Sequence, residues 1–360
     1  MNKITKYLKC TMNKTPVVIA QMHEHTMKVT DYSGKEIYYN PEKLVDGIIQ
    51  VYNQYDFNQP FIGYDVYNIE AEAMGFTVDA FENSTPQISF DSKVDIEDLA
   101  DNLEISSPIR DQGRFEFVLE SRKYFIEKTG LIPHLEFTAP FSLAAQMIGL
   151  ENLLMNIQLE PALVHDLMKK INNRVLKPWL DLQIEEFPES QLILGADAMA
   201  SPPNLNLEML EKFVVPYIKD LKEEFGSKVG VVNWWGESYF EKIENLLKLK
   251  KQVAPYNGML RVQDPDIPKI NMNKIMDFVI KNDLTLTLGL GASFIVNSSK
   301  EELQGRVENY VHMGQGAKDF TLYLCNIGQN TDETKIDLAI NTARESLRSQ
   351  KRWIYPANSA

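Results

Sequence analysis

Polar side chains follow several short apolar runs of this chain, and their types are those that bind substrates or move protons. Parallel strands covered by helices end at one edge of a sheet, so residues that follow such strands converge on one cleft. We expect the residues at the predicted strand ends to lie together there. They are Gln21, His23 and His25; Tyr64 and Asp65; His134 and Glu136; Asp197; Asn233 and Glu237; Gln263 and Asp264; and Cys325 and Asn326.

Two patterns among these residues suit acid–base chemistry. His134 and Glu136 alternate along a predicted strand, so both side chains point to one face. On an interior face they would bind substrate or act as acid and base, and a structural hydrogen-bonded pair is the alternative. Asp65 and Asp197 each end an apolar run, where a carboxylate binds a ligand or caps the next helix. The expected catalytic set is His134, Glu136, Asp197, Asn233 and Glu237.

A metal site and an aromatic pocket are also candidates. His23 and His25 form a His-x-His pattern, which is typical of a metal site or of a solvated loop. Cys325 ends the last predicted strand, where it is a buried apolar residue or a thiolate ligand. Trp234 and Trp235 would wall a pocket for a flat ligand, or pack in the core. The expected substrate-binding set is Gln21, His23, Tyr64, Asp65, Trp234 and Trp235.

The composition excludes several classes of partner. The formal net charge is −13 and the pI is near 5.0. Nucleic acid and anionic membranes bind basic surfaces, so neither is expected as a partner. No run of 18 apolar residues predicts a membrane span. The cysteine count is 2, which fits a reducing compartment, so we expect a cytoplasmic protein.

Apolar runs alternate with amphipathic segments along the chain, which predicts a parallel sheet covered by helices. We therefore predict a single (β/α)₈ TIM-type barrel over residues 1–360, with an N-terminal extension. An open, doubly wound sheet is the alternative, but no Gly-rich dinucleotide fingerprint follows the first strand. Strands are expected at 17–20, 60–65, 131–137, 191–197, 229–233, 259–262, 284–289 and 319–324. Helices are expected at 41–52 with Asn40 as the N-cap, 70–74 closed by Gly75, 111–128, 144–187 divided by Pro161 and Pro178, 207–225, 239–252, 301–313 and 332–347. Residues 89–109 are expected as an acidic, loop-rich segment.

Several segments resemble the uroporphyrinogen decarboxylase superfamily. They are residues 195–202, 207–217 and 140–149, while residues 70–75 are similar to its corrinoid-dependent methyltransferase branch. The resemblance implies a (β/α)₈ barrel and one of two activities. The decarboxylases hold an acidic tetrapyrrole with arginines near the N-terminus. Residues 21–25 contain no arginine here, and the cationic residues before them are all lysines. Decarboxylation is therefore disfavoured, because a substrate with many carboxylates would meet an acidic protein without a cationic clamp.

The methyltransferase branch implies a different site. Many of its members bind zinc through a His-x-Cys pattern and a cysteine near the last strand. Asn233 and Trp235 replace the first two ligands here, and only Cys325 matches the third. This departure argues against zinc activation of a thiol, which needs more than one such ligand. The resemblance implies instead a methylated donor, such as an aryl methyl ether or a methylamine, whose leaving atom is activated by protonation or by a metal.

The resulting hypothesis is methyl transfer between a small methylated donor and cobalamin on a separate corrinoid protein. Methylcobalamin on the partner is the implied cofactor, and zinc stays open. Two alternatives remain: tetrapyrrole decarboxylation, and a barrel that binds a small ligand without catalysis. The sequence does not decide the oligomeric state, and a homodimer is one of the open choices.

Overall fold

The computed structural model describes residues 18–57 and 61–354, with side chains up to residue 347. The contacts between Cα atoms divide the chain into two compact units. Unit 1 holds the described residues of 1–31, 47–61 and 260–360, and unit 2 holds 32–46 and 62–259. The predicted N-terminal extension, residues 1–17, lies outside the described residues, and the single domain stays a prediction.

Unit 1 contains a parallel sheet in the order β1-β9-β8-β7. Leu324 of β9 lies level with Ala20 of β1 and with Leu290 of β8, so these strands end at the same edge. The strands are β1 (Val18–Ala20), β7 (Met259–Gln263), β8 (Thr285–Gly291) and β9 (Phe320–Cys325). The helices are α2 (His23–Thr30), α15 (Met272–Lys281), α16 (Ala292–Asn297), α17 (Lys300–Gly314) and α18 (Glu333–Ile354).

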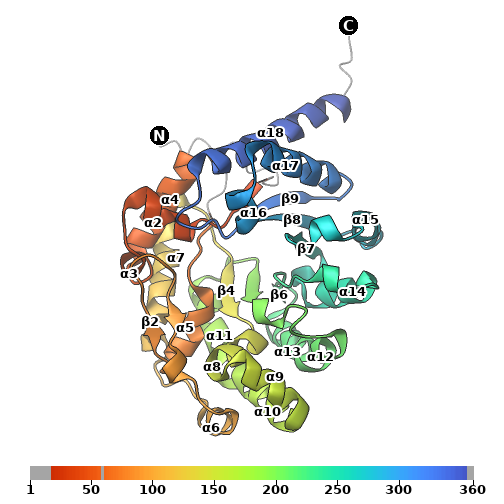
Figure 1. Ribbon diagram of the computed structural model, residues 1–360. Coiled ribbons are helices and arrows are strands. Elements are labelled where there is room, and N and C mark those ends of the chain that lie inside the picture. Colours follow the sequence, from red (N-terminus) through yellow and green to blue (C-terminus); the bar gives the residue numbers. More distant parts are fainter. Residues whose placement is uncertain (1–17, 58–60, 355–360) are drawn as a thin grey trace. The chain divides into compact units, whose positions relative to one another are not determined.

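The two faces of this sheet differ because residues alternate along each strand. One face is apolar and mostly buried, and α17 packs on it, as Figure 1 shows for β8 and β9. At Gly314 of α17 a Cβ would come within 2.1 Å of the Phe320 ring, so the helix approaches the strand only with glycine there. The other face carries polar side chains, of which Tyr323 is buried and the others are partly exposed: Arg261, Gln263, Thr285, Thr287, Thr321 and Cys325.

Unit 2 contains the parallel sheet β4-β5-β6 and a short antiparallel pair, β2 with β3. The strands are β2 (Val78–Asp79), β3 (Gln87–Ile88), β4 (Leu135–Thr138), β5 (Ile193–Ala196) and β6 (Val229–Val231). The helices are α3 (Gly34–Ile37), α5 (Val66–Ala73), α6 (Ile96–Asn102), α7 (Phe115–Thr129), α8 (Pro140–Ile148), α9 (Leu150–Leu159), α10 (Pro161–Ile171), α11 (Lys177–Glu186), α12 (Leu207–Phe213), α13 (Val215–Phe225) and α14 (Ile243–Val253). Helix α4 (Pro41–Gln54) has residues in both units.

Glycine allows close packing inside the second sheet. A Cβ at Gly195 would lie 2.8 Å from the Phe137 ring and 3.0 Å from Val231. The register places these three residues side by side on β4, β5 and β6. The ring of Phe137 therefore occupies the space that a side chain on the middle strand would need.

Local signals in the sequence explain several helix boundaries. The backbone N–H of Lys43 donates to Asn40 Oδ1 over 2.9 Å, so the predicted N-cap of α4 is confirmed. Pro161 begins α10 and Pro178 lies in the first turn of α11, as the predicted division of the helical region requires. Gly75 follows α5 with a φ of +91°, which confirms it as the glycine that ends this helix.

Several predicted boundaries are wrong. Residues 21–25 were expected on a strand or loop, but α2 begins at His23. No strand is assigned to residues 61–65, where Tyr64 and Asp65 bond to arginine side chains instead, and Pro60 lies outside the described residues. The region 89–109 contains the helix α6, and the helix expected over 207–225 divides into α12 and α13.

Candidate functional site

The carboxyl ends of β5 and β6 bring two predicted residues together. Asp197 follows the last residue of β5, and Asn233 lies two residues beyond β6. The backbone N–H of Asp197 donates to Asn233 Oδ1 over 3.0 Å. The prediction that strand-end residues converge is therefore confirmed for this pair.

The carboxyl group of Asp197 is fully buried and accepts hydrogen bonds at both oxygens. Oδ1 accepts from the Ser142 backbone N–H (3.2 Å) and hydroxyl (2.8 Å), and Oδ2 accepts from Trp234 Nε1 (2.9 Å). Ser142 Oγ itself accepts from the Met199 N–H, so its proton is free to point at Asp197. Burial raises the pKa of Asp197 to about 7, against the lowering effect of these donors. Donors on both oxygens suit the ionised carboxylate.

Tyr67, in the first turn of α5, joins the same network, and the sequence analysis did not single it out. Its hydroxyl oxygen accepts from the Ala198 N–H over 3.0 Å and from Asn233 Nδ2 over 2.9 Å. The amide of Asn233 has a defined orientation, because its Oδ1 must face the N–H of Asp197. Burial raises the pKa of Tyr67, so the phenol stays protonated. Nothing in the apolar pattern around Tyr67 marks this contact.

The loop after β6 depends on glycine and on a buried ion pair. Gly236 has a φ of +97°, and a Cβ there would lie 2.4 Å from the Pro202 carbonyl oxygen. Glu237 is fully buried and pairs with Lys250, which also donates to the Trp234 carbonyl over 2.9 Å. Glu237 thus anchors the loop that carries Trp234.

The two predicted tryptophans differ in exposure. Trp234 is 2% exposed and its indole N–H donates to Asp197. It therefore packs in the core, which was the alternative to a pocket wall. Trp235 is half-buried, and its backbone N–H donates to Ser201 Oγ over 3.2 Å. Of the pair, Trp235 is the one with surface left to meet a ligand.

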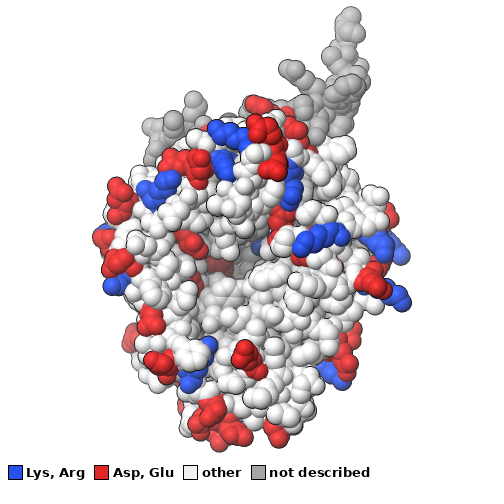
Figure 2. All heavy atoms as spheres, viewed as in Figure 1, with Lys and Arg blue, Asp and Glu red and all other residues white. Residues whose placement is uncertain are grey.

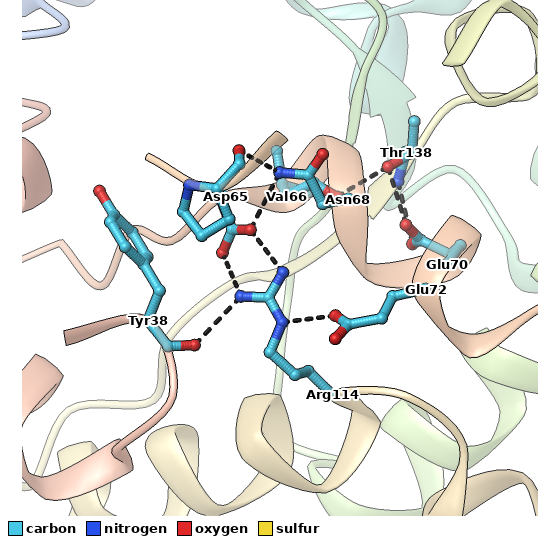
Figure 3. Close-up of polar contacts among 9 residues, drawn as sticks. Tyr38, Asp65, Val66, Asn68, Glu70, Glu72, Arg114 and Thr138 are labelled. Carbon is cyan, nitrogen blue, oxygen red and sulfur yellow. Dashed lines mark hydrogen bonds and ion pairs between the residues drawn. The ribbon is translucent and has the colours of Figure 1, made fainter. Parts of the chain in front are cut away.

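A second polar network in unit 2 is centred on Arg114, just before α7 (Figure 3). Its guanidinium donates to both carboxylate oxygens of Asp65, over 2.8 and 2.5 Å. Nε donates to Glu72 (2.5 Å) and Nη1 to the Tyr38 carbonyl (3.0 Å). Burial alone would lower the pKa of Arg114, but the ion pairs with Asp65 and Glu72 raise it. Asp65 is therefore a buried ion-pair partner rather than a helix cap.

Glu70 lies beside this network on α5 and is bound to β4, as Figure 3 also shows. Its carboxyl group accepts from the Thr138 backbone N–H (3.0 Å) and hydroxyl (2.7 Å). The side chain is fully buried, and burial raises its pKa to about 7. Glu70 thus fixes α5 at the carboxyl end of β4.

His134 and Glu136 interact as predicted, but not at a strand end. His134 Nε2 lies 3.1 Å from Glu136 Oε1, so the shared face is confirmed. Because β4 begins only at Leu135, His134 precedes the strand, and the carboxyl end is at Thr138. Their predicted place at a strand end is therefore wrong. Tyr64 lies at a different point of unit 2, where Arg122 donates to its hydroxyl over 3.2 Å.

Unit 1 holds the remaining predicted residues. Tyr323 donates to Gln21 Oε1 over 2.6 Å, and the Arg261 guanidinium lies 4.5 Å from the centre of the Tyr323 ring. The Cys325 thiol lies 3.8 Å from Gln263 Oε1. These residues share the polar face of the unit 1 sheet, so the predicted convergence holds within this unit as well. Asp264 instead accepts from Arg306 over 3.1 Å, which ties the end of β7 to α17.

The histidines of α2 do not form a joint metal site. His23 and His25 are two residues apart on a helix, so their side chains diverge. His25 is fully buried between the Tyr55 hydroxyl (2.7 Å) and the Gly328 carbonyl (3.2 Å). Within 18–57 and 61–354, no group of three or more His, Cys, Asp or Glu residues is arranged to hold a metal ion. Burial raises the pKa of Cys325 to about 12, which opposes a thiolate ligand.

Parallel strands with polar side chains at their carboxyl ends are typical of α/β barrel enzymes. The sequence matches the family model for uroporphyrinogen decarboxylase (URO-D) over residues 4–346. The chain therefore belongs to the URO-D family, whose members are enzymes with a (β/α)₈ TIM-type barrel, and the predicted superfamily and fold class are confirmed.

A solved structure with the same fold is described as a methyltransferase from Methanosarcina mazei. It aligns with a TM-score of 0.73 at 15% identity, covering 94% of this chain and 96% of that chain. No curated protein is similar enough in sequence to count as a match. None of the helices in the described part of the chain is long and apolar enough to cross a membrane.

Proposed function

We propose that this protein is a corrinoid-linked methyltransferase, which moves a methyl group between a small methylated donor and the cobalamin of a separate partner protein. Family membership supports an enzyme of this superfamily, and the methyltransferase with the same fold supports the branch. The observation that carries the proposal is the network at the ends of β5 and β6. This network offers the uncharged hydroxyl of Tyr67 to a ligand. Both carboxylate oxygens of Asp197 already accept hydrogen bonds from the protein.

The arginines argue against tetrapyrrole decarboxylation, because a substrate with many carboxylates needs cations that are not already paired. Of the seven arginines whose side chains are described, four form ion pairs with carboxylates of the protein and three contact neutral groups of it. The contacts are Arg110 with Glu186, Arg114 with Asp65, Arg122 with Gln183, Arg174 with the Leu103 carbonyl, Arg261 with the Tyr323 ring, Arg306 with Asp264, and Arg344 with Asp56.

Figure 2 adds that acidic side chains gather over α6 on the face it shows. They belong to the acidic run around this helix, which includes Glu97, Asp98 and Asp101. With a net charge of −13, the protein would repel a polyanionic substrate rather than attract it. A small donor that is neutral or cationic suits these charges better.

The proposed reaction balances without a further oxidant. The corrinoid is the second substrate, and its Co(I) form supplies the electron pair of the new bond to carbon. The bond between the methyl carbon and its heteroatom breaks with the electron pair on the heteroatom, which takes a proton from water. The chain binds the donor, orients the methyl group and stabilises charge on the leaving atom. The residues around Cys325 do not fit a zinc site, so no step is assigned to a metal there.

Of the predicted catalytic residues, Asn233 and Asp197 are proposed to position the Tyr67 hydroxyl, and Trp235 is proposed to pack on the donor. His134 and Glu136 remain predicted reacting groups. Their positions do not support that role, because His134 precedes β4 and Glu136 lies within it rather than at its carboxyl end. Zinc content measured on the purified protein, with activity before and after chelation, tests the metal assignment. Stoichiometric zinc required for activity would demand a ligand set other than the one around Cys325.

The proposal is tested with the purified protein and chemically reduced free cobalamin, cob(I)alamin, as the acceptor. The donors are an aryl methyl ether, trimethylamine, a quaternary methylammonium compound and a methyl thioether. Loss of the cob(I)alamin absorption with formation of methylcobalamin is expected with at least one donor. No methylcobalamin with any donor, alongside release of CO₂ from uroporphyrinogen, would favour decarboxylation. Saturable donor binding without either reaction would favour a non-catalytic binding protein.

A further inference from the structure

The Tyr67 hydroxyl is held in an unusual way, because both of its contacts are with hydrogen-bond donors. The Ala198 backbone N–H is a donor by chemistry, at 3.0 Å from the phenolic oxygen. The Asn233 side chain presents its NH₂ group at 2.9 Å, because its carbonyl oxygen is occupied by the Asp197 N–H. A phenolic oxygen has two lone pairs, so these two bonds use its acceptor capacity. The O–H proton is left to point elsewhere.

Within the described ranges, no residue takes this proton. Tyr67 is half-buried, so part of its surface stays open to a ligand. Two N–H donors on the oxygen also polarise the O–H bond and make it a stronger donor. The group that completes this arrangement is an acceptor with a lone pair, brought by the substrate.

We propose that Tyr67 is a catalytic residue that donates a hydrogen bond to the oxygen of a methyl ether, and so selects ethers over methylammonium donors. This assignment rests on the proposed methyl transfer and names the donor class for the same site. An ether oxygen is neutral and keeps lone pairs that accept a hydrogen bond. A quaternary nitrogen has no lone pair, and a tertiary amine loses its own by protonation near neutral pH.

The nearby carboxylate agrees with a neutral donor. A cationic substrate is usually met by an unpaired carboxylate or by aromatic faces. Both oxygens of Asp197 are instead occupied by Ser142 and Trp234, so its charge is turned toward the protein. Asn233 connects the two groups, since it accepts from the Asp197 N–H and donates to Tyr67.

The transfer from an ether breaks the bond between methyl carbon and oxygen and forms the bond between carbon and cobalt, as described above. As the bond between methyl carbon and ether oxygen breaks, negative charge develops on that oxygen, and the Tyr67 O–H bond stabilises it. The cleaved oxygen then takes a proton from water, so Tyr67 ends the reaction in its starting form. The burial that raises the pKa of Tyr67 keeps its proton in place throughout the working pH range.

The test compares wild type with Tyr67→Phe on a series of substituted aryl methyl ethers, with cob(I)alamin as the acceptor. The variant is expected to lower kcat/KM for the unsubstituted ether by about 10²- to 10³-fold, the usual effect of losing one such donor. The loss should shrink as electron-withdrawing groups make the departing phenol more acidic, because a better leaving group needs less help. An equal loss along the series, or a loss below about 3-fold, would overturn the assignment.

The matched control is Tyr217→Phe, which removes a tyrosine hydroxyl from α13 of the same unit, where it bonds to His165. It should leave methyl transfer unchanged. The donor preference of wild type gives a second test that does not depend on how any variant folds. Transfer from the ether in preference to a quaternary methylammonium supports the assignment, and the reverse preference overturns it. Transfer that ignores Tyr67 leaves the proposed function standing, whereas no transfer from any donor removes both.

Discussion

Unit 2 contains two polar networks, one around Arg114 and Asp65 and the other around Asp197 and Tyr67. Their buried carboxyl groups are neutralised in different ways. Asp65, just before α5, is bonded to the guanidinium of Arg114, which also meets Glu72. No cation among the described side chains contacts the oxygens of Asp197, which are held by the neutral donors of Ser142 and Trp234. The first network is closed within the protein. The second leaves one donor, the Tyr67 hydroxyl, directed away from its own partners.

This difference separates a structural role from a functional one. A buried ion pair is costly to break, because removing one partner leaves the other charge without compensation. The Arg114 guanidinium makes four hydrogen bonds within the protein, which leaves little of it for a ligand. Burial raises the pKa of Asp197 to about 7 against the effect of its neutral donors, so this carboxyl group can respond to what binds beside it. Helix α5 carries both networks, since Asp65 precedes it and Tyr67 lies in its first turn.

The largest effect should come from breaking the ion-pair network with Arg114→Leu. The substitution leaves Asp65 buried and charged without its partner, which costs about 3–5 kcal/mol of unfolding free energy. Urea unfolding followed by circular dichroism measures it. Lys123→Leu, which removes a partly exposed cation bonded to Glu120 on α7, is the control and should cost under about 1 kcal/mol. A similar cost for both would mean that the Arg114 network is not a closed structural unit.

A smaller loss of stability is expected from Asp197→Asn. The amide must turn its NH₂ group toward either Ser142 or Trp234, where a donor already points. One buried donor is left unsatisfied, at about 1–3 kcal/mol. Methyl transfer should also fall, because Asn233 and Tyr67 are positioned through the Asp197 segment. Unchanged stability together with unchanged kcat/KM would show that Asp197 is not the centre of this network.

The sequence predicted the part of this arrangement that depends on strands. Apolar runs ending in Asp197 and Asn233 indicate the carboxyl ends of parallel strands, and the structure brings these residues together. Tyr67 could not be predicted, because its contacts cross from a helix to residues more than a hundred positions away. The position of His134 was misjudged because β4 starts four residues later than the apolar run suggests.

The roles of single polar residues could not be predicted from the sequence either. Asp65 was expected to cap a helix or bind substrate, but nothing in the local sequence reveals that Arg114 would fold against it. His25 was a candidate ligand, and its partners, Tyr55 and the Gly328 carbonyl, come from distant segments. Strand ends can be read from hydrophobic patterns, whereas the partners of a polar side chain depend on tertiary contacts that the pattern does not encode.

The pH dependence of stability tests the contrast between the networks. Burial raises the pKa of Asp197 and of Glu70 to about 7, while an unfolded carboxyl group titrates near pH 4. Between these values the native protein holds more protons than the unfolded chain, so stability falls as the pH rises. Each group should contribute a loss of about 2 kcal/mol between about pH 5.5 and pH 8.

Urea unfolding at both pH values checks this, with Asp197→Asn and Glu70→Gln each expected to flatten the dependence by its own share. Stability that these substitutions leave with the same pH dependence would mean that burial does not raise the pKa of either carboxyl group.

The smallest expected effect extends the comparison to unit 1, where Cys325 faces Gln263 on the polar side of its sheet. Burial raises the pKa of this thiol to about 12, so little thiolate is present at neutral pH. Iodoacetamide should therefore alkylate Cys325 at least about 10-fold more slowly than free glutathione at the same pH. Mass spectrometry of the peptide that contains Cys325 separates its rate from that of Cys10. Alkylation as fast as that of glutathione would show a reactive thiolate at this strand end, and would make unit 1, rather than the Tyr67 network, the place to look for a nucleophile or a metal ligand.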